Sequence, residues 1–219
     1  MKKETRRNFC ISICLLLAFV LWTLAICYFD VGAIGPRNSS VGFARINAFF
    51  HNLTGVNMSL YNITDWLGLV PVCFGMGFAL LGLIQWIKSK HLKNVDNSIF
   101  VLGGFYIVVM IAYILFEFVV INHRPVLING YLEVSYPSST TLLVLCVMPT
   151  AIMQLNGRIK NNILKRSVAF IISVFIVFMV MGRLVSGVHW LTDIIGGALL
   201  SASLVMMYYS FCNLFDSNK

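Results

Sequence analysis

The chain has 219 residues, of which 59% are hydrophobic and 11% are charged, and its mean hydropathy is +0.86. A soluble domain carries about 25% charged residues, so this composition excludes an ordinary soluble protein. A membrane-spanning helix needs about 20 apolar residues, and the length leaves room for about six spans with short connections. We therefore expect an all-α, polytopic membrane protein in which residues 1–219 form a single membrane-embedded domain.

A polar and basic segment, residues 1–7, precedes the first apolar stretch. That stretch is longer than the roughly 7–15 apolar residues of a cleaved signal peptide, and no small-x-small cleavage site follows it. We interpret it as a retained first helix. The six expected spans are residues 8–29, 67–87, 99–121, 140–155, 167–184 and 191–212.

The long segment between the first two spans, residues 30–65, contains an amphipathic stretch. Its apolar residues recur at helical spacing and are interrupted by polar ones, which predicts a short helix lying in the membrane interface. The apolar positions are Phe43, Ile46, Phe49, Phe50 and Leu53, and the polar ones are Arg45, Asn47 and Asn52.

The basic residues are distributed unevenly between the two ends of the expected spans. Twelve of the sixteen Lys and Arg residues lie in the N-terminus, in segments 88–97 and 156–166, and at Lys219. Cytoplasmic segments collect Lys and Arg, so we expect these segments and both chain ends in the cytoplasm. This topology explains the net charge of +8 without a nucleic-acid partner. Trp66 and Trp190 would then lie at outer span ends and Trp86 at an inner one, where such rings favour the interface.

The cysteines do not indicate metal or disulfide chemistry. They lie in or beside apolar stretches, and none forms a CxxC or Cys/His ligand pattern. We interpret them as small membrane-buried side chains, and we expect neither a metal nor a cofactor. The six are Cys10, Cys14, Cys27, Cys73, Cys146 and Cys212.

Polar and charged residues gather at the outer ends of the last four spans, where such residues are costly and usually functional. Arginine forms bidentate hydrogen bonds to phosphate oxygens, and a helix N-terminus offers free N–H groups to an anion. Together they predict a phosphate site. Each residue alone could instead be a helix cap or an interfacial side chain. The residues are Arg124, Pro137, Ser138, Ser139, Thr140, Arg183, His189 and Asp193.

The turn from the fifth to the sixth span carries the most specific pattern. Its sequence, Gly182-Arg183-x5-His189-x3-Asp193, resembles the third signature of the type 2 phosphatidic acid phosphatase (PAP2) family, Ser-Arg-x5-His-x3-Asp. The resemblance implies a six-helix membrane enzyme that removes phosphate from a lipid at the outer face through a phosphohistidine, without a metal. It makes His189 the nucleophile and Asp193 the residue that orients its imidazole. A sixth helix beginning near Val188 would place both on one face.

Two shorter patterns resemble the other signatures of this family. Arg124-Pro125 resembles the end of the first, Lys-x6-Arg-Pro, and Pro-Ser-Ser-Thr at residues 137–140 resembles the second, Pro-Ser-Gly-His. The resemblance therefore covers about residues 117–193, the region of the expected site. It implies that the phosphate oxygens are bound by Arg124, Arg183, Ser138, Ser139 and Thr140.

Three positions depart from these signatures. Glu117 stands where the first has Lys, Ser139 where the second has Gly, and Thr140 where the second has its general-acid His. Glu117 cannot bind phosphate as an ammonium does, and we expect it to be protonated or paired with Arg183. A missing acid costs about 10²–10⁴ in rate. His123 and Glu117 are the candidate replacement proton donors.

The sequence leaves three functional hypotheses. The first is a phosphatase or phosphotransferase that acts on a lipid phosphate or polyprenyl diphosphate at the outer face of the cell membrane. The second, motivated by the lost Lys and His, is a catalytically degenerate relative that binds or transports a phosphorylated lipid. The third is a structural membrane protein. The expected partners are the phosphorylated lipid and the surrounding membrane lipids, and the sequence gives no oligomeric state.

Overall fold

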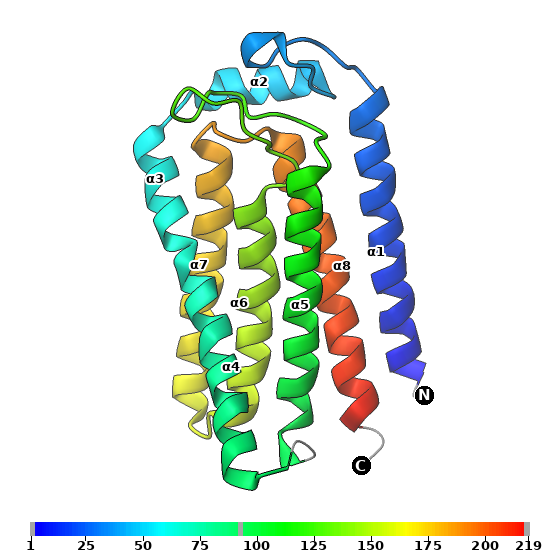
Figure 1. The fold of residues 1–219 in the computed structure, drawn as a ribbon, viewed down its shortest axis with the longest axis vertical. Coiled ribbons are helices and arrows are strands. Elements are labelled where there is room, and N and C mark those ends of the chain that lie inside the picture. Colours follow the sequence, from blue (N-terminus) through cyan, green and yellow to red (C-terminus); the bar gives the residue numbers. More distant parts are fainter. Residues whose placement is uncertain (1–2, 92–93, 217–219) are drawn as a thin grey trace.

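The computed structural model describes residues 3–91 and 94–216 of the chain. Its long helices run side by side as one bundle, and a short helix lies across one end of that bundle (Figure 1). The elements are α1 (Lys3–Tyr28), η1 (Pro36–Asn38), α2 (Ala44–Thr54), α3 (Met58–Leu67), α4 (Leu69–Ser89), α5 (Asn97–Phe118), α6 (Ser139–Arg158), α7 (Asn162–Val185) and α8 (Leu191–Asp216).

The described residues contain six helical stretches that are long and apolar enough to cross a membrane, which confirms the expected number of spans. The largest difference is in the second span, expected at 67–87, because α3 and α4 together form one stretch, Met58–Ser89. Asn57 caps its start, with its Oδ1 accepting a hydrogen bond of 2.9 Å from the backbone N–H of Leu60. The span therefore begins about two turns earlier, and part of the expected outer segment belongs to the bundle.

Helix α8 lies at the centre of the bundle, where it packs against α1, α5, α6 and α7. In the membrane windows of α6 and α8, 50% of the residues are buried, compared with 22% or less in the other four spans. Ser12 and Ser203 join α1 to α8 through two reciprocal hydrogen bonds, each from a hydroxyl to the other residue's carbonyl oxygen at 2.9 Å. Small residues allow such close packing between membrane helices.

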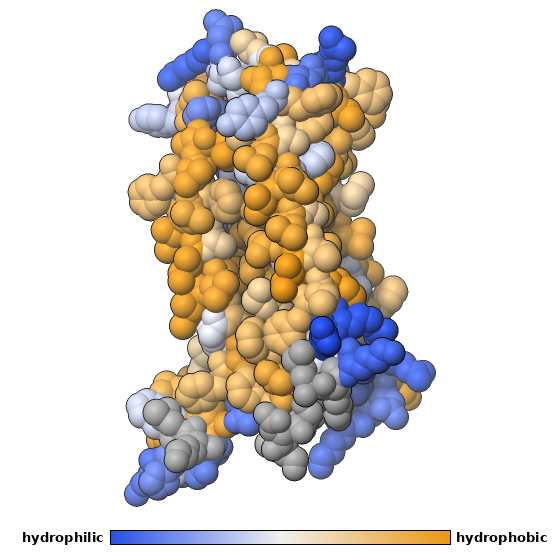
Figure 2. All heavy atoms as spheres, turned by 90° about the vertical axis from the view of Figure 1, so that its right-hand side faces the viewer, coloured by the Kyte–Doolittle hydropathy of each residue, from blue (hydrophilic) through white to orange (hydrophobic). Residues whose placement is uncertain are grey.

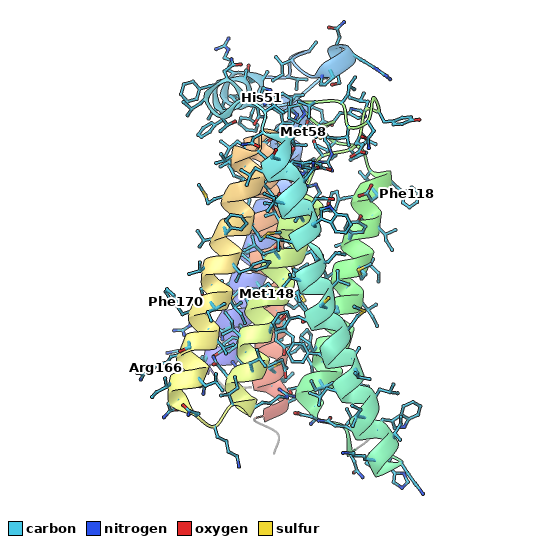
Figure 3. All side chains as sticks on the ribbon, turned by 90° about the vertical axis from the view of Figure 1, so that its left-hand side faces the viewer. His51, Met58, Phe118, Met148, Arg166 and Phe170 are labelled. Carbon is cyan, nitrogen blue, oxygen red and sulfur yellow. The ribbon has the colours of Figure 1, made fainter. Side chains whose placement is uncertain are left out.

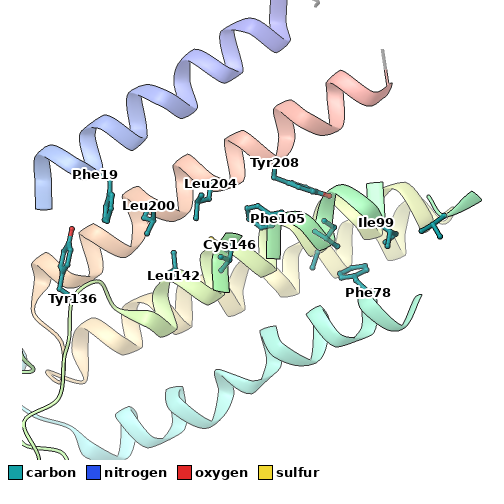
Figure 4. Close-up of a cluster of buried hydrophobic side chains, with 14 of the residues drawn as sticks. Phe19, Phe78, Ile99, Phe105, Tyr136, Leu142, Cys146, Leu200, Leu204 and Tyr208 are labelled. Atoms are coloured by element: carbon teal, nitrogen blue, oxygen red, sulfur yellow. The ribbon is translucent and has the colours of Figure 1, made fainter. Parts of the chain in front are cut away.

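The main apolar core runs along these central helices (Figure 4). Its outermost labelled residue is Tyr136, which belongs to the connection between α5 and α6. The Tyr136 ring stacks on Phe19 with a centroid separation of 6.3 Å, and its hydroxyl shares a hydrogen bond of 2.7 Å with Thr23. These contacts with α1 anchor the connection at the end of the bundle.

The lateral surface of the bundle is apolar between two hydrophilic ends (Figure 2). Phe170 on α7 points away from the bundle and is 69% exposed, whereas Met148 on α6 lies between the helices and is 1% exposed (Figure 3). Exposed apolar side chains along the full length of the spans require hydrocarbon as their solvent. The chain is a multi-pass membrane protein.

The short helix expected within residues 30–65 is α2. Its Phe49 and Leu53 are 62% and 70% exposed, and Asn47 is fully buried. The Asn47 side-chain amide donates hydrogen bonds to the carbonyl oxygen of Gly42 at 2.8 Å and to the hydroxyl of Thr192 at 3.0 Å. Asn47 therefore fastens α2 to the first turn of α8, while apolar side chains remain exposed on the other side of α2.

The two ends of the bundle differ in charge and in composition. Both chain ends and the α4–α5 and α6–α7 connections lie at the end opposite α2 (Figure 1). Arg166 on α7 is at this basic end, and His51 on α2 is at the other (Figure 3). Of the twelve basic residues expected on one side, Lys2, Lys93 and Lys219 lie outside the described residues.

Candidate active site

Four buried polar residues meet at the end of the bundle near α2. Arg124 comes from the α5–α6 connection, Arg183 from the last turn of α7, His189 from the α7–α8 connection and Asp193 from the first turn of α8. Their exposures are 8%, 1%, 4% and 0%, respectively. The structure therefore brings together the two arginines, the histidine and the carboxylate that the sequence predicted to form one site.

The imidazole of His189 faces both arginines through its Nε2 atom. Nη2 of Arg183 lies 3.1 Å and Nη1 of Arg124 lies 3.3 Å from this nitrogen. A guanidinium can only donate hydrogen bonds, so Nε2 must be the acceptor and Nδ1 must carry the ring proton. Burial, followed by the charges of Arg124 and Arg183, lowers the pKa of His189 well below its ordinary value. The ring is therefore neutral at neutral pH, and the lone pair of Nε2 is directed toward the two guanidiniums.

The carboxylate of Asp193 lies on the opposite side of this imidazole. Its Oδ2 accepts a hydrogen bond of 2.9 Å from the backbone N–H of Trp190, and its Oδ1 accepts one of 3.3 Å from the side-chain amide of Asn122. Nδ1 of His189 is 3.7 Å from Oδ2, which is an electrostatic contact longer than a hydrogen bond. The carboxylate is thus fixed by its neighbours and directed toward the protonated ring nitrogen.

Helix α8 begins at Leu191, the expected start of the sixth span, and not near Val188, where it would have to begin to place His189 and Asp193 on one helix face. His189 therefore precedes the helix and does not share a helix face with Asp193. The turn before α8 brings the two together instead. Its Gly187 has a φ of 67°, and a Cβ atom at this position would lie 1.8 Å from the carbonyl oxygen of Gly55. Only glycine permits this approach to the α2–α3 connection.

Each arginine also contacts a carboxylate away from His189. Nε of Arg124 lies 3.0 Å from Oε2 of Glu133, and Nη1 of Arg183 lies 3.4 Å from Oδ1 of Asp65. The carboxylate beside Arg183 is thus Asp65 and not Glu117, which leaves protonation as the other alternative expected for Glu117. The side chains of Glu133 and Asp65 are 40% and 56% exposed, so these two ion pairs reach the surface. The ion pairs use other nitrogens than those that face His189. The N–H groups directed at Nε2 of His189 therefore remain inside the protein.

A narrow pocket opens beside His189, with a volume of about 20 Å³. This is room for about one water molecule, and neither Arg124 nor Arg183 lines the pocket. Glu117 from α5 and Ser139 from α6 line the pocket together with His189. His123, the other candidate proton donor, is absent from the pocket lining, and its carbonyl oxygen accepts a hydrogen bond of 2.7 Å from Trp190 Nε1.

The second pattern forms the start of α6. Ser138 is its N-cap, and the backbone N–H of Ser138 donates a hydrogen bond of 3.1 Å to the carbonyl oxygen of Asp193. The Ser138 hydroxyl accepts a hydrogen bond of 3.0 Å from the hydroxyl of Thr141, which leaves its own proton available. The Thr140 methyl group faces Gly68, because a Cβ atom at position 68 would lie 3.7 Å from that methyl carbon. The start of α6 thus lies against the start of α8.

Trp190 differs from its expected place at the membrane interface. It is 2% exposed and packs over His51, with ring centroids 5.5 Å apart. Its backbone N–H and its indole N–H are both used in hydrogen bonds that organise the site. Trp66 and Trp86, with exposures of 75% and 45%, do lie on the surface.

Several residues at the site were not singled out from the sequence. They come from α3 and from the α5–α6 connection, which do not contain the most specific signature. The one sequence signal was Asp65, an acidic residue beside an apolar span, which follows Tyr61 by four residues and so shares a helix face with it. The missed residues are Tyr61, Thr64, Asp65, Asn122 and Glu133.

The fold and the site define a class of membrane protein, namely a six-span bundle with a neutral histidine held against two buried arginines and a carboxylate at one end. A family model described as the PAP2 superfamily matches residues 40–215. The chain belongs to the PAP2 superfamily, as its three patterns indicated.

A solved structure has the same fold. It is the crystal structure described as that of the first transmembrane PAP2 type phosphatidylglycerolphosphate phosphatase from Bacillus subtilis. The TM-score is 0.62 and the sequence identity is 17%, and the match covers 92% of this chain and 96% of that one. A search of curated proteins found no match. The structural likeness establishes the fold of this chain.

Proposed function

We propose that this protein is a phosphatase that removes phosphate from a lipid phosphate or a polyprenyl diphosphate through a covalent intermediate on His189. The observation that carries the proposal is the neutral imidazole whose Nε2 faces two buried guanidiniums. The same N–H groups that now reach Nε2 could instead bind phosphate oxygens and so hold the phosphorus atom in front of the lone pair.

The reaction would proceed in two displacements. The lone pair of Nε2 attacks phosphorus, the bond from phosphorus to the lipid-side oxygen breaks, and that oxygen leaves with the bonding electrons. A water molecule then attacks phosphorus, the phosphorus–nitrogen bond breaks, and inorganic phosphate and neutral His189 are formed while one water proton is released. Arg124 and Arg183 stabilise the charge on the transferring group in both steps.

The remaining predicted residues would support this chemistry in different ways. Asp193 would stabilise the positive charge that His189 acquires when its Nε2 bonds to phosphorus. The hydroxyl of Ser138 and the free backbone N–H groups of Ser139 and Thr140, in the first turn of α6, would donate hydrogen bonds to phosphate. Because the methyl group of Thr140 faces Gly68, we assign phosphate binding to its N–H.

The test is turnover by the purified protein on a panel of lipid monophosphates and diphosphates with radioactive terminal phosphate. We expect phosphate release and, after rapid acid-free quenching, a labelled protein whose label is lost in acid, as from a phosphoramidate. Vanadate should inhibit by mimicking the five-coordinate transition state. Lipid binding without release would instead identify the degenerate relative, and label recovered on an added alcohol would identify a phosphotransferase.

We also propose that the site faces the outer side of the cell membrane. The proposal is supported by the basic residues at the opposite end of the bundle, which favour the cytoplasm. Single cysteines introduced in a cysteine-free background should be labelled from outside at Asn129 and only from inside at Lys90 and Lys160, all three of which are exposed. Labelling of Asn129 from the cytoplasmic side would contradict this orientation.

A further inference from the structure

One aromatic ring contacts both arginines of the site. The guanidinium carbon of Arg183 lies 4.8 Å, and that of Arg124 lies 5.6 Å, from the ring centroid of Tyr61 on α3. Both are within the distance of a cation–π interaction. Tyr61 is 8% exposed and belongs to none of the three signature-like patterns. We propose that Tyr61 is the positioning residue that holds the two arginines together at the phosphate site, an inference that rests on the proposed function.

The two arginines need such a residue because they repel each other. Both are almost fully buried, and like charges in a poorly hydrated site repel more strongly than in water. A carboxylate placed between them would cancel this repulsion, but it would also repel an incoming phosphate. The ring of Tyr61 attracts both cations through its π electrons and carries no net charge. It can therefore hold the guanidiniums together without adding a negative charge beyond those of Glu133 and Asp65, which pair with them at the surface.

The position of Tyr61 is fixed by close packing between α3 and α7. A Cβ atom at Gly182 would lie 2.7 Å from the methyl carbon of Thr64, so α3 can take this position only because residue 182 is glycine. The family signature has Ser at this position. The hydroxyl of Thr64 donates to the carbonyl oxygens of Leu60 and Tyr61 at 2.9 and 3.0 Å, which prevents its methyl group from turning away.

The start of α3 is also tied to the loop that carries His189. The backbone N–H of Asn57 donates a hydrogen bond of 2.9 Å to the carbonyl oxygen of Ser186. Tyr61 itself packs against Ile128 in the α5–α6 connection and Val188 in the α7–α8 connection. These contacts hold the Tyr61 ring in a fixed position relative to His189 and to both arginines.

The first test compares Tyr61→Phe with Tyr61→Leu in the intact protein, using the affinity for orthovanadate as the readout. Phenylalanine keeps the π face, so Tyr61→Phe should bind vanadate within about twofold of the native protein. Leucine keeps apolar bulk without π electrons, so Tyr61→Leu should bind about 10- to 30-fold more weakly. Tyr131→Leu is the matched control, because Tyr131 is 73% exposed in the α5–α6 connection, and it should bind as the native protein does.

Native affinity in Tyr61→Leu, or equal loss in the Phe and Leu variants, would overturn the proposal. Failure of the native protein to bind vanadate would overturn it together with the proposed function. Vanadate binding without phosphate release from any lipid would contradict only the proposed function, and the comparison of the Tyr61 variants would still decide the role of the ring.

The second test moves α3 without changing Tyr61. Gly182→Ala should weaken vanadate binding about tenfold, because the new methyl group displaces Thr64 and the ring with it. Adding Thr64→Ser removes the obstructing methyl carbon but keeps the hydroxyl, so the double variant should recover most of the native affinity. Equal weakness of the single and double variants would show that the position of α3 does not govern the arginines, and would refute the proposal even if Tyr61→Leu failed to fold.

Discussion

Replacement of His189 by alanine is expected to lower phosphate release from lipid substrates by at least about 10⁴-fold. The substitution removes Nε2, whose lone pair faces both arginines, and loss of a nucleophile removes the covalent route altogether. The measurement is single-turnover release of inorganic phosphate by the detergent-purified variant. Labelled phosphoprotein should be lost in parallel.

The matched control is His91→Ala, because His91 is exposed at the opposite end of the bundle. It should release phosphate at the native rate. Asp193→Asn should slow formation of the phosphoprotein while leaving vanadate binding nearly unchanged, because the proposed role of the carboxylate is to stabilise the imidazolium. Native turnover in His189→Ala would show that another group is the nucleophile.

A lipid diphosphate is expected to be hydrolysed about 10²–10⁴-fold faster than a matched lipid monophosphate. Breaking a monoester expels an alkoxide, whose parent alcohol has a pKa similar to that of water, about 15.7. Breaking a diphosphate expels a phosphate, whose second pKa is only about 6, so it needs no proton donor. Thr140 stands where the family signature has the His that supplies this proton, and threonine cannot replace it.

The direct check is Thr140→His, which should raise turnover of alkyl monophosphates and leave that of diphosphates and aryl phosphates almost unchanged. Thr140→Gln is the control for side-chain size, because glutamine has no proton to transfer at neutral pH. Equal native rates on matched mono- and diphosphates would mean that a donor is already present. Glu117 is then the first candidate because it lines the pocket with His189, and Glu117→Gln should remove only the monoester activity.

The limits of the membrane helices could be predicted where the apolar run of the helix itself determines them. Five of the six spans both begin and end within about five residues of their predicted limits, because a run of about 20 apolar residues suffices to identify a membrane helix. The second span was mislocated because α3 carries Tyr61, Thr64 and Asp65, whose polarity suggested an outer segment. These side chains face other helices, and that contact is not visible in a local hydropathy pattern.

In the candidate site, too, a pattern within one short segment could be predicted and contacts between side chains far apart in a helix or loop could not. His189, Asp193 and Arg183 were recognisable because they lie within eleven residues of one another at a specific spacing. Glu133 and Asn122 were not. Glu133 pairs with Arg124 inside the irregular α5–α6 connection, Asn122 contacts Asp193 on another element, and neither spacing is periodic in the sequence. The pairing of Glu117 with Arg183 was reasonable from charge alone. In the structure, Asp65 on α3 is the carboxylate that pairs with that arginine.

By itself, the sequence determined that this protein spans a membrane with six helices, has one basic end and carries a histidine, arginine and carboxylate pattern at the other. These properties follow from the length of apolar runs, from charge composition and from short motifs, all of which are local. The tertiary structure alone decided which tautomer His189 adopts, which carboxylates reach the arginines and that Tyr61 contacts both guanidiniums. Those features depend on distances between helices, which packing at positions such as Gly182 and Gly187 sets and which no single segment encodes.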